Sequence, residues 1–186
     1  GIFGSQQIIT TAAQNATHVH AADLDGDGDL DVLSSSRLGP NIAWYKNDGS
    51  GNFGPLQTIT TSGRAESVET ADLDGDGDLD VVSGQFLAPG RVAWYRNDGS
   101  GNFGPQIIVD NGPGGTRKVK TVDLDGDGDY DILSSTTANP GWIMWFKNDG
   151  RGNFGPRQII DFGRGPLSVF AEDIDGDGDK DVIGSF

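Results

Sequence analysis

The sequence contains no cysteine, and only two of its 186 residues are histidine. Disulfides are therefore excluded as a source of stability, and a cysteine nucleophile is excluded as well. No apolar run approaches the length of a membrane span, and no basic patch indicates binding to nucleic acid or anionic lipid. Helical periodicity is also lacking, whereas short β-branched and aromatic runs recur along the chain. These absences favour an all-β chain built from many short strands.

Aspartate, in contrast, is abundant, and it is concentrated in a nine-residue segment that occurs four times. The first copy spans Asp23 to Asp31, and the others begin at Asp72, Asp123 and Asp173, about fifty residues apart. Five carboxylates in so short a segment would repel one another if they faced one small volume. The pattern makes physical sense with a cation at its centre.

The spacing of the aspartates indicates calcium. Oxygen ligands at loop positions 1, 3, 5 and 9, a backbone carbonyl at position 7 and a glycine for the sharp turn form the oxygen-rich shell that Ca²⁺ prefers. The sequence therefore predicts four Ca²⁺ sites, in which position 7 contributes its carbonyl and the other positions their side chains. The predicted ligands are Asp23, Asp25, Asp27, Asp29 and Asp31; Asp72, Asp74, Asp76, Asp78 and Asp80; Asp123, Asp125, Asp127, Asp129 and Asp131; and Asp173, Asp175, Asp177, Asp179 and Asp181.

An EF-hand is excluded, although its loop starts in the same way. An EF-hand needs a bidentate glutamate at position 12 and a helix on each side. Position 12 is instead Ser34, Ser83, Ser134 and Gly184, and the flanking runs, such as Val81-Val82, are typical of strands. The loop is thus predicted to be a turn between two strands. An acidic, solvated turn without metal is the alternative.

The rest of each unit also repeats. The loop and its apolar strand are followed by an alternating segment, Ile42 to Asn47 in the first unit, then by an Asn-Asp-Gly-x-Gly-Asn-Phe-Gly hairpin and a further strand, Pro55 to Ile59. Four strands in about fifty residues are typical of a propeller blade. The N-terminal segment Phe3 to Ile9 matches this last strand, and the fourth unit has only two strands. The expected units are approximately 1–52, 53–102, 103–153 and an incomplete 154–186.

The Phe-Gly after the hairpin and the Asp-x-Asp-Gly-Asp-Gly-x-x-Asp loop resemble the FG-GAP and VCBS repeats of integrin α-like, calcium-binding β-propellers. This resemblance covers nearly the whole chain. It implies a radial propeller in which calcium lies between the first two strands of each four-stranded antiparallel blade, here three complete blades and a partial fourth. The family usually closes its ring with more blades than the four loops present here.

Aromatic and histidine residues offer a few further candidates. Three tryptophans share one position of the unit, and we expect them in the core between blades and not as sugar-stacking platforms: Trp44, Trp94 and Trp145. Trp142 has no counterpart in the other units, so it is the candidate for an exposed contact. His18 and His20 face the same side of a strand, as a zinc pair could, but no third ligand accompanies them.

These features predict a calcium-rigidified, non-catalytic scaffold for adhesion or for a surface or fibre structure. A carbohydrate-binding lectin is the first alternative, and an accessory module of a secreted enzyme is the second. Short aspartate turns belong to the weak, extracellular class of calcium sites, with dissociation constants of about 0.1 to 1 mM. Four calcium ions would offset roughly half of the net charge of -15.

The strand count predicts the partners of the chain. A fourth blade of two strands leaves an open edge, which we expect to pair with another copy or with the rest of a longer parent chain. The sequence begins with Gly1 and carries no signal-peptide pattern, so we expect a processed chain or a piece of a longer one. A protein or glycan ligand is a further possibility, without nucleic acid binding or membrane insertion.

Overall fold

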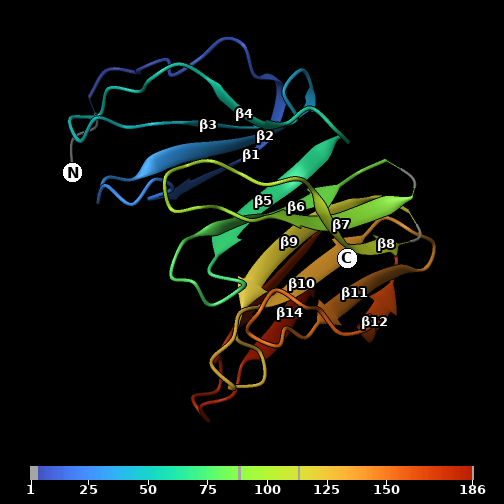
Figure 1. Cartoon of the computed structure of the whole chain (residues 1–186). Helices are drawn as coiled ribbons and strands as arrows, with labels where there is room; N and C mark the ends of the chain where they lie inside the picture. Colours follow the sequence, from blue (N-terminus) through green and yellow to red (C-terminus); the bar gives the residue numbers. More distant parts are fainter. Residues whose placement is uncertain (1–3, 88, 113, 186) are drawn as a thin grey trace.

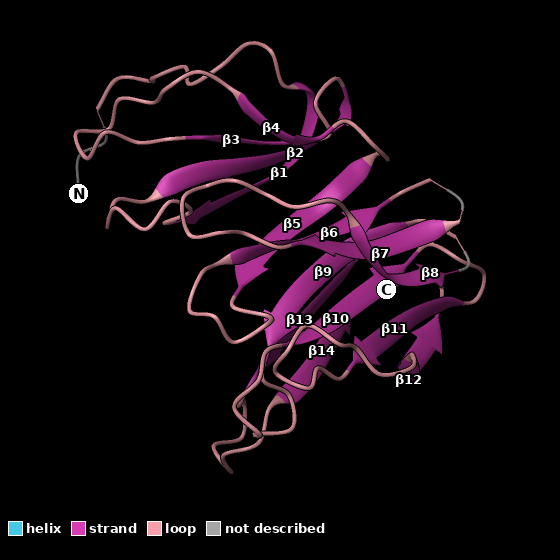
Figure 2. Ribbon diagram, in the orientation of Figure 1, coloured by secondary structure: helices cyan, strands magenta, loops and turns pink. Residues whose placement is uncertain are grey.

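The computed structural model describes residues 4–87, 89–112 and 114–185, and every regular element in these ranges is a β-strand. The strands form separate antiparallel sheets that follow one another from the N-terminal to the C-terminal end of the molecule (Figures 1 and 2). In each sheet the strands are adjacent in space in the order in which they occur in the sequence. This is the blade arrangement of a β-propeller, as the repeat pattern predicted. No helix long and apolar enough to cross a membrane occurs in these ranges.

The first three sheets have four strands each. Their bounds are β1 Gln14–Ala22, β2 Asp31–Leu38, β3 Ile42–Tyr45 and β4 Gln57–Thr60; β5 Ala65–Ala71, β6 Asp80–Gln85, β7 Gly90–Tyr95 and β8 Ile107–Gly112; and β9 Thr116–Val122, β10 Asp131–Thr136, β11 Gly141–Phe146 and β12 Gln158–Gly163. The first strands of neighbouring sheets, β1, β5 and β9, lie side by side (Figure 1). By these bounds, each aspartate loop connects the first strand of its sheet to the second.

The fourth sheet has two strands in the described chain, β13 Ser168–Glu172 and β14 Asp181–Ser185, as the strand count predicted. The strand expected at the N-terminus, Phe3 to Ile9, is not observed. Phe3 lies outside the described residues, and residues 4–9 form no strand. A strand is stable only where a neighbouring backbone completes its hydrogen bonds, and residues Gln7 to Ile9 lie instead beside the hairpin residues Gly51 to Phe53.

The hydrophobic core lies between neighbouring sheets. Three clusters of buried side chains each combine residues from two successive blades, so every blade buries one face against the next. Trp44 and Trp94 are 3% and 4% exposed within the first two clusters, which confirms their expected place in the core. Trp145 contacts the third cluster but is only half-buried. The two-stranded fourth sheet covers less of this tryptophan than a complete blade covers of the other two.

The hairpins of the second and third blades contact the preceding blade. Asn97, which is 2% exposed, donates through Nδ2 to the carbonyl of Leu24 in the preceding aspartate loop at 2.8 Å and to that of Leu79 in its own loop at 3.0 Å. Gly101, at a φ of +74°, lies so close to the Trp44 ring that a Cβ there would overlap it. Asn148 and Gly152 repeat these contacts one blade later. The hairpin thus links two successive loops.

This link can be tested by removing the asparagine amide. Asn97→Ala leaves the buried Leu24 carbonyl without its donor, so the free energy of unfolding should fall by about 1–3 kcal/mol. Asn47→Ala is the matched control, because Asn47 Nδ2 donates only to the exposed Leu30 carbonyl. Urea denaturation of both variants measures the difference. Equal losses would contradict the proposed link between blades.

Candidate metal centres

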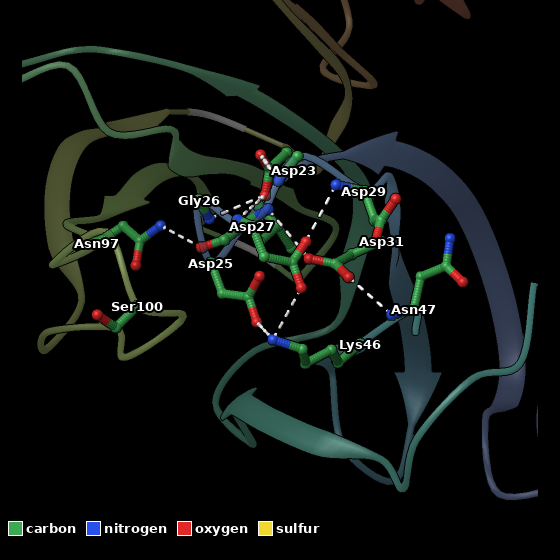
Figure 3. A network of polar contacts seen from close by, with 12 residues as sticks. Asp23, Asp25, Gly26, Asp27, Asp29, Asp31, Lys46, Asn47, Asn97 and Ser100 are labelled. Atoms are coloured by element: carbon green, nitrogen blue, oxygen red, sulfur yellow. Dashed lines mark hydrogen bonds and ion pairs between the residues drawn. The ribbon is translucent and has the colours of Figure 1, made fainter. Parts of the chain in front are cut away.

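Each aspartate loop brings carboxylates together at one point. In each loop, carboxylate oxygens of three aspartates lie within 4.8 Å of one another. The sets are Asp23, Asp25 and Asp27; Asp72, Asp74 and Asp80; Asp123, Asp125 and Asp127; and Asp173, Asp175 and Asp181. All of them occupy loop positions 1, 3, 5 or 9. Each set thus combines positions 1 and 3 with either position 5 or position 9, which is three of the four positions predicted as side-chain ligands, and Figure 3 shows the first loop.

The position-1 carboxylate closes the turn. Asp23 accepts the backbone N–H of Gly26 at 2.8 Å (Figure 3) and that of Gly28 at 2.9 Å. The other three loops repeat both bonds. Gly28 has a φ of +92°, a backbone conformation that favours glycine. The alternation of aspartate and glycine is thus explained locally. Glycine permits the turn, and the first aspartate satisfies its donors.

The position-9 carboxylate ties the loop to the third strand. Asp31 is 0% exposed and accepts the N–H of Leu24 at 3.0 Å and that of Asn47 at 2.8 Å. Asp80 likewise accepts the N–H of Leu73 and that of Asn97. Burial raises the pKa of Asp80 to about 7, because desolvation disfavours the charged form. Burial also raises the pKa of Asp131. A neighbouring cation would offset this desolvation.

In the first two loops, the position-3 carboxylate has a buried oxygen without a partner. The side chains of Asp25 and Asp74 are only 8% and 6% exposed, and Oδ1 of each is buried without a hydrogen-bond donor. A buried oxygen of a charged group is costly unless it is paired. Because these oxygens belong to clusters of hard oxygen ligands, the residues present fit a calcium ion.

The position-7 side chain takes another direction. The Asp29 carboxylate lies against Gly49 of the hairpin in its own blade, where a Cβ would overlap it. Asp78 and Asp129 lie in the same way against Gly99 and Gly150. None of the carboxylate clusters includes a position-7 residue. The assignment of Asp29, Asp78, Asp129 and Asp179 as carbonyl ligands stays a prediction.

A family model described as the FG-GAP-like repeat matches residues 1–34, 25–83, 84–134 and 123–184. Together these matches cover almost the whole chain. The chain belongs to the FG-GAP-like repeat family. The resemblance drawn from the aspartate loop and the Phe-Gly pair is therefore confirmed. A search of curated proteins found no match to the sequence.

Two solved structures resemble this FG-GAP-like chain. A lectin from Agrocybe aegerita, solved for its specific recognition of non-reducing terminal N-acetylglucosamine, is 26% identical, with a TM-score of 0.62 over 90% of this chain and 46% of its own. The V. cholerae biofilm matrix protein Bap1 is 21% identical, with a TM-score of 0.53 over 97% of this chain and 30% of its own. This chain thus spans less than half of either protein. These likenesses agree with the propeller-type fold.

Each complete FG-GAP-like blade also places at its loop a basic side chain that was not among the predicted site residues. Lys46, next to the end of β3, contacts Asp25 and lies 3.0 Å from Asp27 through Nζ (Figure 3). Arg96 and Lys147 hold the same place against positions 3 and 5 of their own loops. The signal was present in the sequence, because a basic residue precedes the hairpin asparagine in all three units.

Trp142, which its irregular position made the candidate for an exposed contact, is only partly exposed. It is half-buried at the margin of the second core cluster, and the Arg157 guanidinium lies 5.4 Å from its ring centroid. Trp145 also differs from the other two repeated tryptophans, because its Nε1 donates to Asp131 Oδ2 at 2.9 Å.

The two histidines form an ionic cluster between blades, away from the aspartate loops. His20 Nε2 lies 2.9 Å from Thr70 Oγ1, and Lys118 Nζ donates to His18 Nε2 at 2.7 Å. The carboxylate of the buried Glu69 forms ion pairs with Lys118 Nζ at 3.4 Å and with Lys120 Nζ at 3.0 Å. The acidic clusters in the described part of the chain contain neither histidine. A zinc pair is therefore not supported.

Protonation of this cluster should destabilise the protein. Burial lowers the pKa of His18 and His20 from 6.5, and Lys118 lowers that of His18 further, although Glu69 acts in the opposite direction on both. A lowered histidine pKa gives a stability that is complete above pH 6.5 and is lost as the pH falls through the folded-state value. The urea midpoint of the wild-type protein should thus fall more between pH 7.5 and pH 5 than that of His18→Gln/His20→Gln. Equal shifts would contradict this.

Proposed function

We propose that this chain is a calcium-binding, non-catalytic repeat scaffold that acts outside the cell, in adhesion or in building a surface or fibre structure. The observation that carries the proposal is the buried, unpartnered Oδ1 of Asp25 and of Asp74 inside clusters of carboxylates. Calcium is the cation whose preferences these hard oxygen ligands match. The family membership supports the same reading, because the loops are its repeated feature.

In this proposal, positions 1, 3, 5 and 9 of each loop hold the ion with their side chains, and position 7 holds it with its carbonyl. The ion supplies positive charge that offsets the crowded carboxylates. Asp31 connects its loop to the third strand through the N–H of Asn47, and Asn97 connects the same loop to the next blade through Leu24. Calcium in one loop would therefore stiffen two successive blades.

The location and the non-catalytic role follow from the same residues. Aspartate-only turns of this type bind calcium with dissociation constants of about 0.1 to 1 mM, which suits the calcium level outside cells. The histidines, which are the usual general bases, are engaged with Lys118 and Thr70 at a distance from the acidic loops. We therefore propose a role in holding or presenting surfaces and not in catalysis.

A lectin is the second candidate function. It is favoured by the 26% identity over 90% of this chain to the Agrocybe aegerita lectin that recognises terminal N-acetylglucosamine. Trp142 with Arg157 above its ring is one candidate contact for a sugar, at the end of a variable linker. A glycan array distinguishes the candidates: glycan binding that Trp142→Ala removes favours the lectin, and filaments or particles in the native preparation favour the scaffold.

Calcium should bind the loops and stabilise the fold. At about 100 times the dissociation constant it should add about 2.7 kcal/mol to the free energy of unfolding for each independent site. Asp74→Asn removes charge from a predicted side-chain ligand, so calorimetry should show one site lost or weakened. Asp78→Asn is the matched control, because its carbonyl remains. An unchanged melting temperature on chelation, or equal loss of binding in both variants, would contradict the proposal.

The fourth sheet is the proposed contact with another copy or with the rest of a longer parent chain. In the described chain, β14 pairs only with β13, and Phe170 and Ile183 are 48% and 49% exposed. A strand edge next to exposed apolar side chains is a template for a further strand.

This proposal predicts self-association of the chain. The mass measured by light scattering should rise with protein concentration, and Ile183→Lys should reduce the rise, because a charged residue on an edge strand discourages pairing. Leu38→Lys is the control, since Leu38 is 46% exposed but lies on β2 of the first blade. A wild-type protein that stays monomeric at high concentration would contradict self-pairing.

A further inference from the structure

We infer that Lys46, Arg96 and Lys147 are internal counter-cations of the aspartate loops, and that each leaves its two carboxylates when a divalent cation binds there. Calcium binding would then be an exchange of one cation for another. This inference rests on the proposed calcium function and adds the residues that set the affinity. The side-chain pairs and the unpartnered carboxylate oxygens carry it.

The basic side chain engages only one half of the position-3 carboxylate. Arg96 Nε lies 2.8 Å from Asp74 Oδ2, and its Nη2 lies 2.9 Å from Asp76 Oδ2, while Asp74 Oδ1 stays buried without a partner. Lys46 repeats this arrangement at Asp25 and Asp27. The basic side chain is therefore a cation that pairs with only some of the carboxylate oxygens of the loop. A divalent ion could also use the remaining oxygens.

The backbone fixes the position of the basic residue. The Gly54 N–H donates to the Lys46 carbonyl at 2.8 Å, and the next residue, Asn47, donates its N–H to Asp31 Oδ1 at 2.8 Å. Gly104 and Gly155 make the first of these bonds to Arg96 and Lys147. Because the same bonds recur, the side chain starts from the same point beside its loop in all three blades.

A basic side chain and calcium cannot both be bound without cost. The two cations would share the carboxylates of positions 3 and 5, so they would lie a few ångströms apart and repel each other. The basic side chain thus stabilises the metal-free loop and weakens calcium binding. Arginine spans both carboxylates with two nitrogens in a rigid fork, so it should weaken binding more than lysine does.

The fourth loop provides an internal control. In the described chain no basic side chain pairs with Asp173, Asp175, Asp177 or Asp181, because the described fourth sheet has only two strands and the basic residue of the other blades follows the third strand. Lys180, inside the fourth loop, pairs with Glu172 at 2.7 Å. The position-6 glycines report the four loops separately, since each donates its N–H to the first carboxylate of its own loop: Gly28, Gly77, Gly128 and Gly178.

The test is a calcium titration followed by the NMR signals of these four amides. Lys46→Met keeps the apolar stem and removes the charge, so the dissociation constant measured at Gly28 should become about tenfold lower. The value at Gly178 should stay unchanged. The melting temperature of Lys46→Met should fall in the metal-free protein more than at saturating calcium. A Gly28 response that is unchanged or weaker would overturn the inference.

A second pair of variants keeps the test independent of how Lys46→Met folds. Arg96→Lys keeps the charge and removes the fork, so binding at Gly77 should become tighter. Arg91→Lys is the matched control, because it makes the same exchange on β7, where Arg91 contacts Asn111 instead of the loop. Equal effects of the two variants at Gly77 would overturn the inference.

The two proposals fail in different ways. If none of the four glycines in the wild-type protein responds to calcium, the proposed calcium function is overturned, and this inference with it. If the wild-type glycines respond and the substitutions of Lys46 and Arg96 leave their affinities unchanged, the inference alone is overturned.

Discussion

Carboxylates crowded into a nine-residue loop repel one another, and the surrounding structure compensates their charge in several ways. Backbone N–H groups of Gly26 and Gly28 point at Asp23. Two further N–H groups bind the buried Asp31, and Lys46 pairs with positions 3 and 5. Because donors come from the loop, from the third strand and from a side chain beside it, the charge of the loop is fully compensated only where the blade around it is complete. Local charge repulsion is thus coupled to the sheet.

The same loops also couple each blade to the next. Asn97 donates to carbonyls of two successive loops, and Gly101 brings its hairpin onto Trp44 of the preceding blade. The core clusters likewise combine residues of neighbouring sheets. A repeat array of this kind has a stability that is approximately a sum of unit and nearest-neighbour terms. Charge compensation in one loop therefore reaches the adjacent blades first, through the asparagine and the tryptophan.

The sequence alone predicted the features that repeat within one unit. The period of about fifty residues predicted four-stranded blades, and the alternation around Trp44 and Trp94 predicted their burial. It could not predict the features that depend on a neighbour. Residues 4–9 have the pattern of a strand but form none, and Trp142 packs at the margin of a core cluster that the preceding blade helps to build. The pairing of Lys46 with Asp25 also needed the third strand placed beside the loop.

Four nearly identical loops lie in different surroundings, and the second residue of each loop records the difference. Leu24 and Leu73 are 1% and 0% exposed beneath the hairpin of the following blade, Leu124 is half-buried, and Ile174 is 58% exposed. The carbonyls of Leu24 and Leu73 accept an amide from that hairpin, and in the described chain those of Leu124 and Ile174 accept none. An oxygen shell held by packing loses less conformational entropy on binding an ion than a solvated one does. If the loops bind calcium as proposed, the position of a loop along the row, and not its motif alone, therefore helps to set its affinity.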